Sequence, residues 1–151
     1  MERPPSIVTF ERLYLGSIAV FIVNAVVFWA ANREMLGMMG QVRASPALAE
    51  LIAPIMIVAL VVTVLASVLF WYLIVRRHHV AGKWLVVVTE AVGVVTALQA
   101  LVRLVSGTAP NPPGVMLSIL STALAVAAAI MLFRPDALTW FGESSMLDGR
   151  A

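Results

Sequence analysis

Four long runs of apolar residues restrict the fold of this chain more than any other feature. A helix needs about 20 apolar residues to cross the roughly 30 Å hydrocarbon core of a bilayer. Four segments meet that standard: 13–31, 52–75, 84–105 and 114–133. Only helices and closed barrels pair every backbone N–H and C=O in lipid, and continuous apolar runs differ from the alternating strands of a barrel. The sequence therefore predicts an all-α fold, an integral membrane four-helix bundle, with residues 1–151 as a single transmembrane domain.

The composition agrees with a membrane protein. Of the 151 residues, 62% are hydrophobic and 12% are charged, whereas a soluble domain carries about 25% charged residues. The net charge of +2 is too small, and the basic residues too scattered, to predict binding to nucleic acid. The chain has no cysteine, which excludes disulfides, thiolate metal sites and cysteine nucleophiles. The expected partner is the lipid bilayer.

The second apolar run contains Pro54 in its early part. A proline inside a helix removes a hydrogen bond and bends the helix. Either a helix capped by Ser45 and Pro46 bends at Pro54, or residues 46–53 form an interfacial turn before the span. We favour the bent helix.

The basic residues predict the orientation of the spans, because Lys and Arg near span ends gather on the cytoplasmic side. One side would hold Arg3, Arg12, Arg76, Arg77, Lys83, Arg134 and Arg150, and the other Arg33, Arg43 and Arg103. This excess predicts that both the N-terminus and the C-terminus are cytoplasmic. Beyond the fourth run, Pro135 ends the helix, and Leu138, Trp140 and Phe141 are placed to anchor the chain in the membrane interface.

Glu90 is a carboxylate inside the third apolar run. It lies seven residues beyond Lys83, which is roughly 10 Å along a helix at about 1.5 Å per residue. A carboxylate at that depth is costly, so proton or cation binding is one hypothesis. The structural hypotheses, which we favour, are a hydrogen bond to another helix or a place in a water-filled vestibule. The candidate polar partners on other helices are Ser17, Asn24, Thr63 and Ser67.

Glu90 and the other polar residues of its helix are predicted to fall on different faces. At about 100° per residue, Thr89, Thr96, Gln99 and Arg103 share an arc of roughly 80°. Glu90 stands about 100° from Thr89 and nearly opposite Gln99 by the same helical period. We therefore expect Thr96 and Gln99 to make hydrogen bonds between helices, and Glu90 to meet a different neighbour.

Small residues recur every four positions in the second run, at Ala59, Thr63 and Ser67. Such spacing lets helices approach closely in lipid. It predicts a compact bundle, held most firmly through the second span, or contacts between copies of the chain.

Two further groups carry metal-ligating side chains, but neither predicts a metal site. His78 and His79 are neighbours in a loop with no third ligand evident, so we interpret them as solvated or in contact with lipid head groups. Met35, Met38 and Met39 follow the first run. Thioethers favour Cu(I), but we interpret these three residues as packing residues near the interface.

The motifs of nucleotide-binding loops, metalloprotease helices and nucleophile elbows are missing from the sequence. We therefore expect no catalytic residue, no metal and no cofactor, and predict that the chain is not an enzyme.

Two segments of the sequence carry a resemblance to known proteins. FERLYLGSIAVFIVNAVVFW (10–29) and LFRPDALTWF (132–141) resemble parts of small uncharacterised four-span bacterial inner-membrane proteins. That resemblance implies a multi-pass protein of the bacterial inner membrane. The chain is also similar in size and span number to the small multidrug resistance transporters, but those carry their key glutamate in the first helix, where this chain has Asn24. The missing cysteines separate it from the thiol-oxidising four-helix membrane proteins.

The sequence leads to two hypotheses of function. The first is a non-enzymatic membrane protein, an accessory subunit or an oligomeric module, whose partner is itself or another membrane protein. The alternative is a small ion-coupled transporter or channel that uses Glu90.

Overall fold

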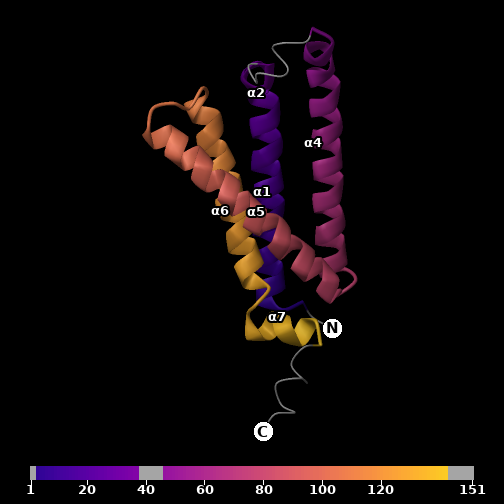
Figure 1. The fold of residues 1–151 in the computed structure, drawn as a ribbon. Coiled ribbons are helices and arrows are strands. Elements are labelled where there is room, and N and C mark those ends of the chain that lie inside the picture. The colour runs from indigo at the N-terminus through magenta and orange to yellow at the C-terminus, as the bar shows by residue number, and fades with distance from the viewer. Residues whose placement is uncertain (1–2, 38–45, 143–151) are drawn as a thin grey trace.

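The computed structural model describes residues 3–37 and 46–142, and the fold of these residues is entirely helical (Figure 1). The helices are α1 (Pro5–Val27), α2 (Trp29–Gly37), α4 (Pro46–Val75), α5 (Val80–Val105), α6 (Pro112–Met131) and α7 (Pro135–Trp140). Within the described ranges, four helices are long and apolar enough to cross a membrane, namely α1, α4, α5 and α6. The predicted all-α fold with four spans is confirmed.

The ends of the first two spanning helices differ from the predicted ranges. α1 begins at Pro5 rather than at residue 13, because proline suits the first position of a helix, where its missing N–H costs nothing. It ends at Val27, and Phe28 alone separates it from α2. α4 continues through Pro54 without interruption, so residues 46–53 are helical and do not form an interfacial turn.

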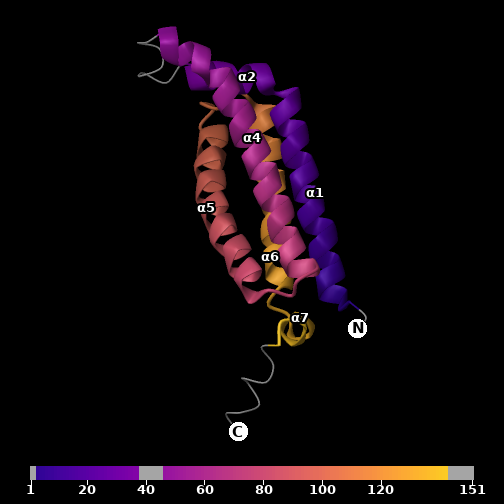
Figure 2. The same ribbon diagram turned by 90° about the vertical axis from the view of Figure 1, so that its right-hand side faces the viewer.

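The four spanning helices run up and down in sequence order, and two views show which segments meet at each end (Figures 1 and 2). One end, here called the α7 end, holds α7, the start of α1 and the 76–79 connection between α4 and α5. The opposite end, the α2 end, holds α2 and the 106–111 connection between α5 and α6.

The basic residues divide between these ends as the sequence predicts. Within the described part of the chain, those on elements at the α7 end are Arg3, Arg12, Arg76, Arg77, Lys83 and Arg134, and those at the α2 end are Arg33 and Arg103. Arg43 and Arg150 lie outside the described residues.

The buried core lies at the α7 end. Its members are Ile7, Phe10, Tyr14, Ile74, Val75, Val86, Ala128, Ala129, Leu132, Ala137 and Phe141. Phe10 and Tyr14 stack with ring centroids 5.2 Å apart. These residues come from α1, α4, α5, α6 and α7, so segments from the whole chain converge there.

The closest helix pair is α1 with α6, not a pair built on α4. Ala125, Ala128 and Ala129 on α6 are buried, and the hydroxyl of Ser121 donates to the Ser17 carbonyl of α1 at 2.9 Å. Ala59 and Thr63 of α4 are exposed. The prediction that the second span holds the bundle most firmly is therefore wrong, because small residues pack closely only where a partner helix faces them.

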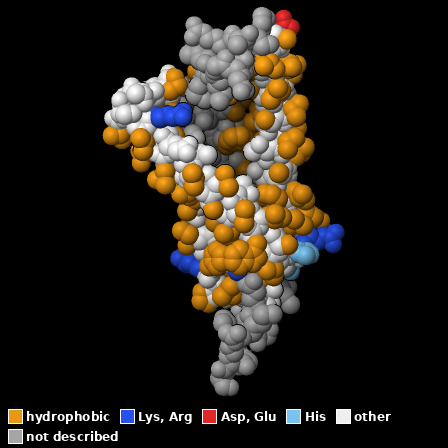
Figure 3. Space-filling view, viewed as in Figure 1, with side chains coloured by type: hydrophobic (Ala, Val, Ile, Leu, Met, Phe, Trp, Pro, Cys, Tyr) orange, Lys and Arg blue, Asp and Glu red, His pale blue; other side chains and the backbone are white. Residues whose placement is uncertain are grey.

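The outward faces of α4 and α5 are apolar and unpacked within this single chain. Only 6% of the most apolar stretch of each helix is buried, against 28% for α1. The space-filling view shows orange side chains along the described surface and a hollow between α4 and the α5–α6 connection (Figure 3). Contact with the hydrocarbon of a bilayer suits these faces, because it leaves no apolar surface in water.

Candidate functional site

A pocket of about 220 Å³ lies among the spanning helices, on the α2 side of the buried core. Each of the four spanning helices contributes polar side chains to its wall. These are Tyr14 and Ser17 from α1, Thr63 and Ser67 from α4, Thr89 and Glu90 from α5, and Ser121 and Thr122 from α6. Residues far apart in the sequence thus build one polar space inside an otherwise apolar bundle.

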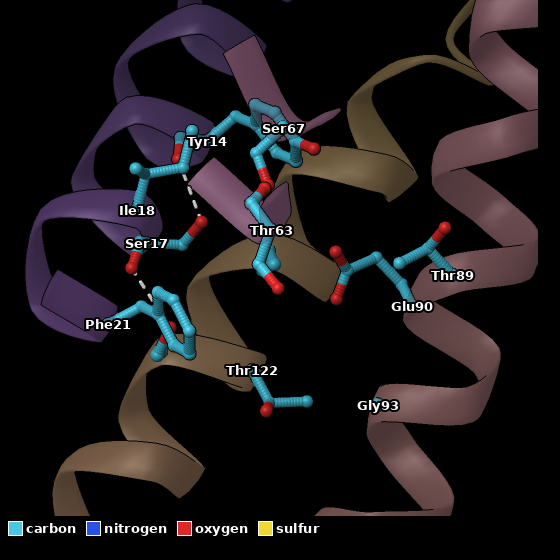
Figure 4. A pocket seen from close by; sticks show the side chains of 12 residues that line it. Tyr14, Ser17, Ile18, Phe21, Thr63, Ser67, Thr89, Glu90, Gly93 and Thr122 are labelled. Atoms are coloured by element: carbon cyan, nitrogen blue, oxygen red, sulfur yellow. Dashed lines mark hydrogen bonds between the residues drawn. The ribbon is translucent and has the colours of Figure 1, made fainter. Parts of the chain in front are cut away.

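The Glu90 carboxylate projects from α5 into this pocket, toward the side where Thr63, Ser67 and Tyr14 lie (Figure 4). It is half-buried. Gly93 stands one turn further along α5, and a β-carbon there would lie 3.5 Å from Glu90 Oε2. The carboxylate therefore rests over a position without a side chain, which leaves room for it between α5 and α6.

Glu90 makes no hydrogen bond and no ion pair among residues 3–37 and 46–142. Tyr14 and Ser67 line the same pocket wall as Glu90 (Figure 4). The predicted hydrogen bond from Glu90 to Ser17, Thr63 or Ser67 is therefore not made, although all three residues line the pocket.

Five of the seven hydroxyl groups that line the pocket donate their protons to backbone carbonyls, and Tyr14 and Thr63 carry the other two. The bonds are Ser17 to Tyr14 O at 2.7 Å, Ser67 to Thr63 O at 2.8 Å, Thr89 to Leu85 O at 2.8 Å, Ser121 to Ser17 O at 2.9 Å and Thr122 to Ser118 O at 3.1 Å. A hydroxyl has one proton and two lone pairs. Because these protons are engaged, the five oxygen atoms can only accept hydrogen bonds from anything that enters the pocket.

This arrangement can bind a proton, a cation or a group rich in N–H donors. A carboxylate and hydroxyl oxygens present negative and partly negative atoms, and a low-dielectric surrounding strengthens their attraction for positive charge. The volume of about 220 Å³ is below the roughly 300–1,000 Å³ of usual small-molecule sites. The pocket therefore suits a small ion or the head group of a larger molecule.

Three other predicted residues lie away from Glu90. Asn24 is at the α2 end, where its buried Oδ1 has no partner among the described residues and would lie 3.3 Å from a β-carbon at Gly114. Thr96 and Gln99 are exposed on α5. Thr96 donates to the Gly93 carbonyl of its own helix at 2.8 Å, so the interhelical bond expected for it is not present.

The predicted separation of faces on α5 holds for Thr96 and Gln99 but not for Thr89. Thr89 lines the pocket beside Glu90, because the pocket is wide enough to span two adjacent positions of the helix. Tyr14 and Ser121 also line it, and sequence reasoning did not single them out. Tyr14 lies three residues before Ser17 on the same helix face, which is the signal that could have identified it.

The residues with metal-ligating side chains do not gather. No group of three or more His, Cys, Asp or Glu that could hold a metal lies within the described ranges. His78 and His79 are exposed, and the ring of His78 lies on Trp140, with centroids 3.9 Å apart. Met35 belongs to α2, but its side chain, like all of Met38 and Met39, lies outside the described residues.

A second set of polar contacts closes the α7 end. The first helix has no side-chain cap of its own, and the Ser6 backbone N–H donates to Asp136 Oδ2 of α7 at 3.1 Å. Contact with Ser6 lowers the pKa of the Asp136 carboxyl. Ser6 Oγ is buried without a hydrogen bond to any described residue, so the bond from the Ser6 backbone N–H is the one that joins α1 to α7.

Trp140 and Phe141 also belong to this closure, through contacts with α4 and α5. Trp140 Nε1 donates to the Ile74 carbonyl at the end of α4 at 3.3 Å. Phe141 is 8% exposed, and the buried Lys83 places its Nζ 4.5 Å from the Phe133 ring and 5.7 Å from the Phe141 ring. α7 therefore ties α1, α4 and α5 together at one end.

Comparison with protein families, with curated proteins and with solved structures finds no match. The features that indicate a function are the chain's own: four candidate membrane spans with a polar pocket between them.

Proposed function

We propose that this chain is a non-enzymatic, multi-pass protein of the bacterial inner membrane that binds a proton or a small cation at Glu90 and couples that binding to transport. One observation carries the proposal: Glu90 faces a pocket to which all four spanning helices contribute acceptor oxygens. Because the pocket contacts all four spanning helices, a change in the charge of Glu90 can change how these helices are arranged.

The geometry favours this role over a purely structural one. A structural carboxylate inside a membrane is expected to pair with a neighbouring donor, because an unpaired polar group in hydrocarbon is costly. Glu90 makes no such hydrogen bond or ion pair with a described residue. The pocket instead leaves space beside the carboxylate, as binding and release of an ion require.

Proton movement into liposomes tests the proposal. The purified protein is placed in liposomes that contain a pH-sensitive dye, and a proton gradient is applied. We expect Glu90→Gln to reduce the proton flux to that of empty liposomes while its thermal unfolding stays the same. Glu50→Gln is the matched control, because Glu50 is exposed on α4 and lies outside the pocket. A wild-type protein without flux, or a Glu90→Gln variant with full flux, would contradict the proposal.

An accessory subunit or oligomeric module is a second candidate, supported by the unpacked apolar faces of α4 and α5. Native purification in mild detergent, with the mass of the particle measured, tests it. The candidate requires more than one chain per particle or a partner that co-purifies. A particle containing one chain and no other protein argues against it.

We also propose that the α7 end faces the cytoplasm, supported by the excess of Lys and Arg there. Because the chain has no cysteine, single cysteines at Gly142 and Gly107 report the two sides without background. An impermeant maleimide added to intact cells should label the cysteine at Gly107 and not that at Gly142. The reverse pattern would invert the orientation.

A further inference from the structure

A second cavity meets Glu90 from the opposite side. It is an apolar groove of about 250 Å³ between α5 and α6, and its walls include Val87, Ala91, Val126, Ala129 and Phe133. Ile130 and Phe133 at its edge are 58% and 45% exposed, so the groove opens on the surface that faces the lipid. Glu90 lines this groove as well as the polar pocket, and it is the described residue that the two cavities share.

From this arrangement we propose that the ligand of the site is an organic ammonium ion with an apolar chain, which reaches Glu90 sideways from the bilayer. This inference rests on the proposed function, since it names the class of cation that the same pocket takes. The ammonium group would occupy the polar pocket and the chain would lie in the α5–α6 groove. Neither cavity alone reaches the roughly 300 Å³ at which usual small-molecule sites begin.

The head group decides the class of ligand. A primary ammonium group has three N–H donors and no acceptor, and the pocket wall offers a carboxylate and hydroxyl oxygens whose own protons are engaged. Charge-assisted hydrogen bonds to a carboxylate are among the strongest in proteins. An anion would be repelled by the Glu90 carboxylate, and Ser17, Ser67 and Thr89 would offer it no free donor.

The alkyl chain of the ligand determines the path by which it reaches Glu90 from the bilayer. An alkyl chain gains little by leaving lipid for the groove, because lipid tails are equally apolar. The groove therefore gives the alkyl chain a path and a space to occupy, and the ammonium group supplies most of the binding free energy. Gly93 lines the polar pocket, and its lack of a side chain leaves space for the head group between Glu90 Oε2 and Thr122 Cγ2, which would lie 3.5 Å and 3.7 Å from a β-carbon there.

Binding of octylammonium to the full chain in lipid nanodiscs tests this inference. Radiolabelled octylammonium is dialysed against protein-loaded nanodiscs, and the uptake of empty nanodiscs is subtracted. We expect saturable binding to the wild type that is weaker by about tenfold or more in Glu90→Gln, because a charge-assisted bond is lost. Octyltrimethylammonium, which has no N–H, should also bind about tenfold more weakly.

Substitution of two alanines by phenylalanine distinguishes the contribution of the groove to binding from that of the polar pocket. Ala91 lines the α5–α6 groove beside Glu90, whereas Ala123 lines the neighbouring groove, which has no carboxylate; both are exposed. Ala91→Phe should weaken octylammonium binding and leave methylammonium binding unchanged, which also shows that the variant is folded. Ala123→Phe should change neither.

Three results would overturn the inference: octylammonium binding that survives Glu90→Gln, binding that ignores Ala91→Phe, or equal binding of octyltrimethylammonium. The proton-flux experiment fails or succeeds separately. Octylammonium binding without a Glu90-dependent flux removes the proposed transport and leaves the ligand class standing. A Glu90-dependent flux without octylammonium binding removes the ligand class alone.

Discussion

The two ends of the bundle differ in how they are held. At the α7 end, fully buried side chains from α1, α4, α5, α6 and α7 form one core, and α7 adds hydrogen bonds to α1 and α4. At the α2 end, Gly114 is buried and Asn24 Oδ1 is buried without a described partner. Most large side chains of α4 and α5 toward that end are exposed.

The pocket lies at the boundary between the tightly packed α7 end and the loosely packed α2 end. Tyr14 belongs both to the core and to the pocket wall, so the pocket begins where the tight packing stops. Regions with few buried contacts open at lower free energy than the core does. We infer that helix movement around Glu90 occurs by opening of the α2 end, with the α7 end as the fixed part.

Truncation of a leucine at each end gives the largest expected difference. Leu132 is 0% exposed in the core and Leu98 is 57% exposed on α5. Leu132→Ala should lower the free energy of unfolding by about 2–5 kcal/mol, because it leaves a cavity. Leu98→Ala should change it by about 0.5 kcal/mol or less. Unfolding in mixed detergents, followed by circular dichroism, measures both, and equal losses would remove the distinction between the ends.

Removal of the indole N–H that joins α7 to α4 should have a smaller effect. Trp140→Phe keeps an aromatic ring against His78 and deletes the bond to the Ile74 carbonyl. We expect a loss of about 1 kcal/mol, the usual net contribution of a hydrogen bond. Trp84→Phe serves as the control, because Trp84 is 53% exposed. A loss as large in the control would show that ring size, rather than the bond, is responsible.

The smallest effect concerns the Asp136 carboxylate and depends on pH. Interaction with Ser6 lowers the pKa of Asp136 from an ordinary value of about 3.9. A lowered pKa in the folded state stabilises the protein above about pH 4, and this stabilisation is lost as the pH falls through the lowered pKa.

Asp136→Asn should therefore lower the free energy of unfolding by about 0.5 kcal/mol at neutral pH, the low end for a helix cap. Its stability should fall less than that of the wild type between pH 5 and about pH 2. Unfolding titrations at a series of pH values compare the two. Parallel curves over this range would mean that Asp136 does not hold α1.

The spans were predictable from the sequence, but the contacts at the α7 end were not. Continuous apolar runs identify a membrane helix wherever its neighbours lie, which is why all four spans are confirmed. Asp136 and Ser6 are 130 positions apart, and nothing local in either segment indicates that they meet. The sequence placed Trp140 in the membrane interface, and it did not indicate that the indole N–H donates to the Ile74 carbonyl of α4.

The pocket was predictable only in part. Helical periodicity on α5 separated Glu90 from Gln99, because both lie on one rigid element. It did not show that Asn24 lies at the far end, or that Ser121 of α6 joins the wall beside Ser17. Those facts depend on which helices pair, and the small residues of the second run indicated close packing of α4, whereas α1 and α6 form the main pair.

Measuring the protonation state of Glu90 in lipid is the most direct test of whether this pocket binds a proton or a cation. Infrared difference spectra of the membrane-embedded protein are recorded as the pH changes and as methylammonium is added, and Glu90→Gln assigns the carboxyl band. If Glu90 binds protons and cations, its band should convert between carboxylic acid and carboxylate with pH and should shift when methylammonium binds. A Glu90 band that responds to neither would contradict the assignment of this pocket as a proton- or cation-binding site.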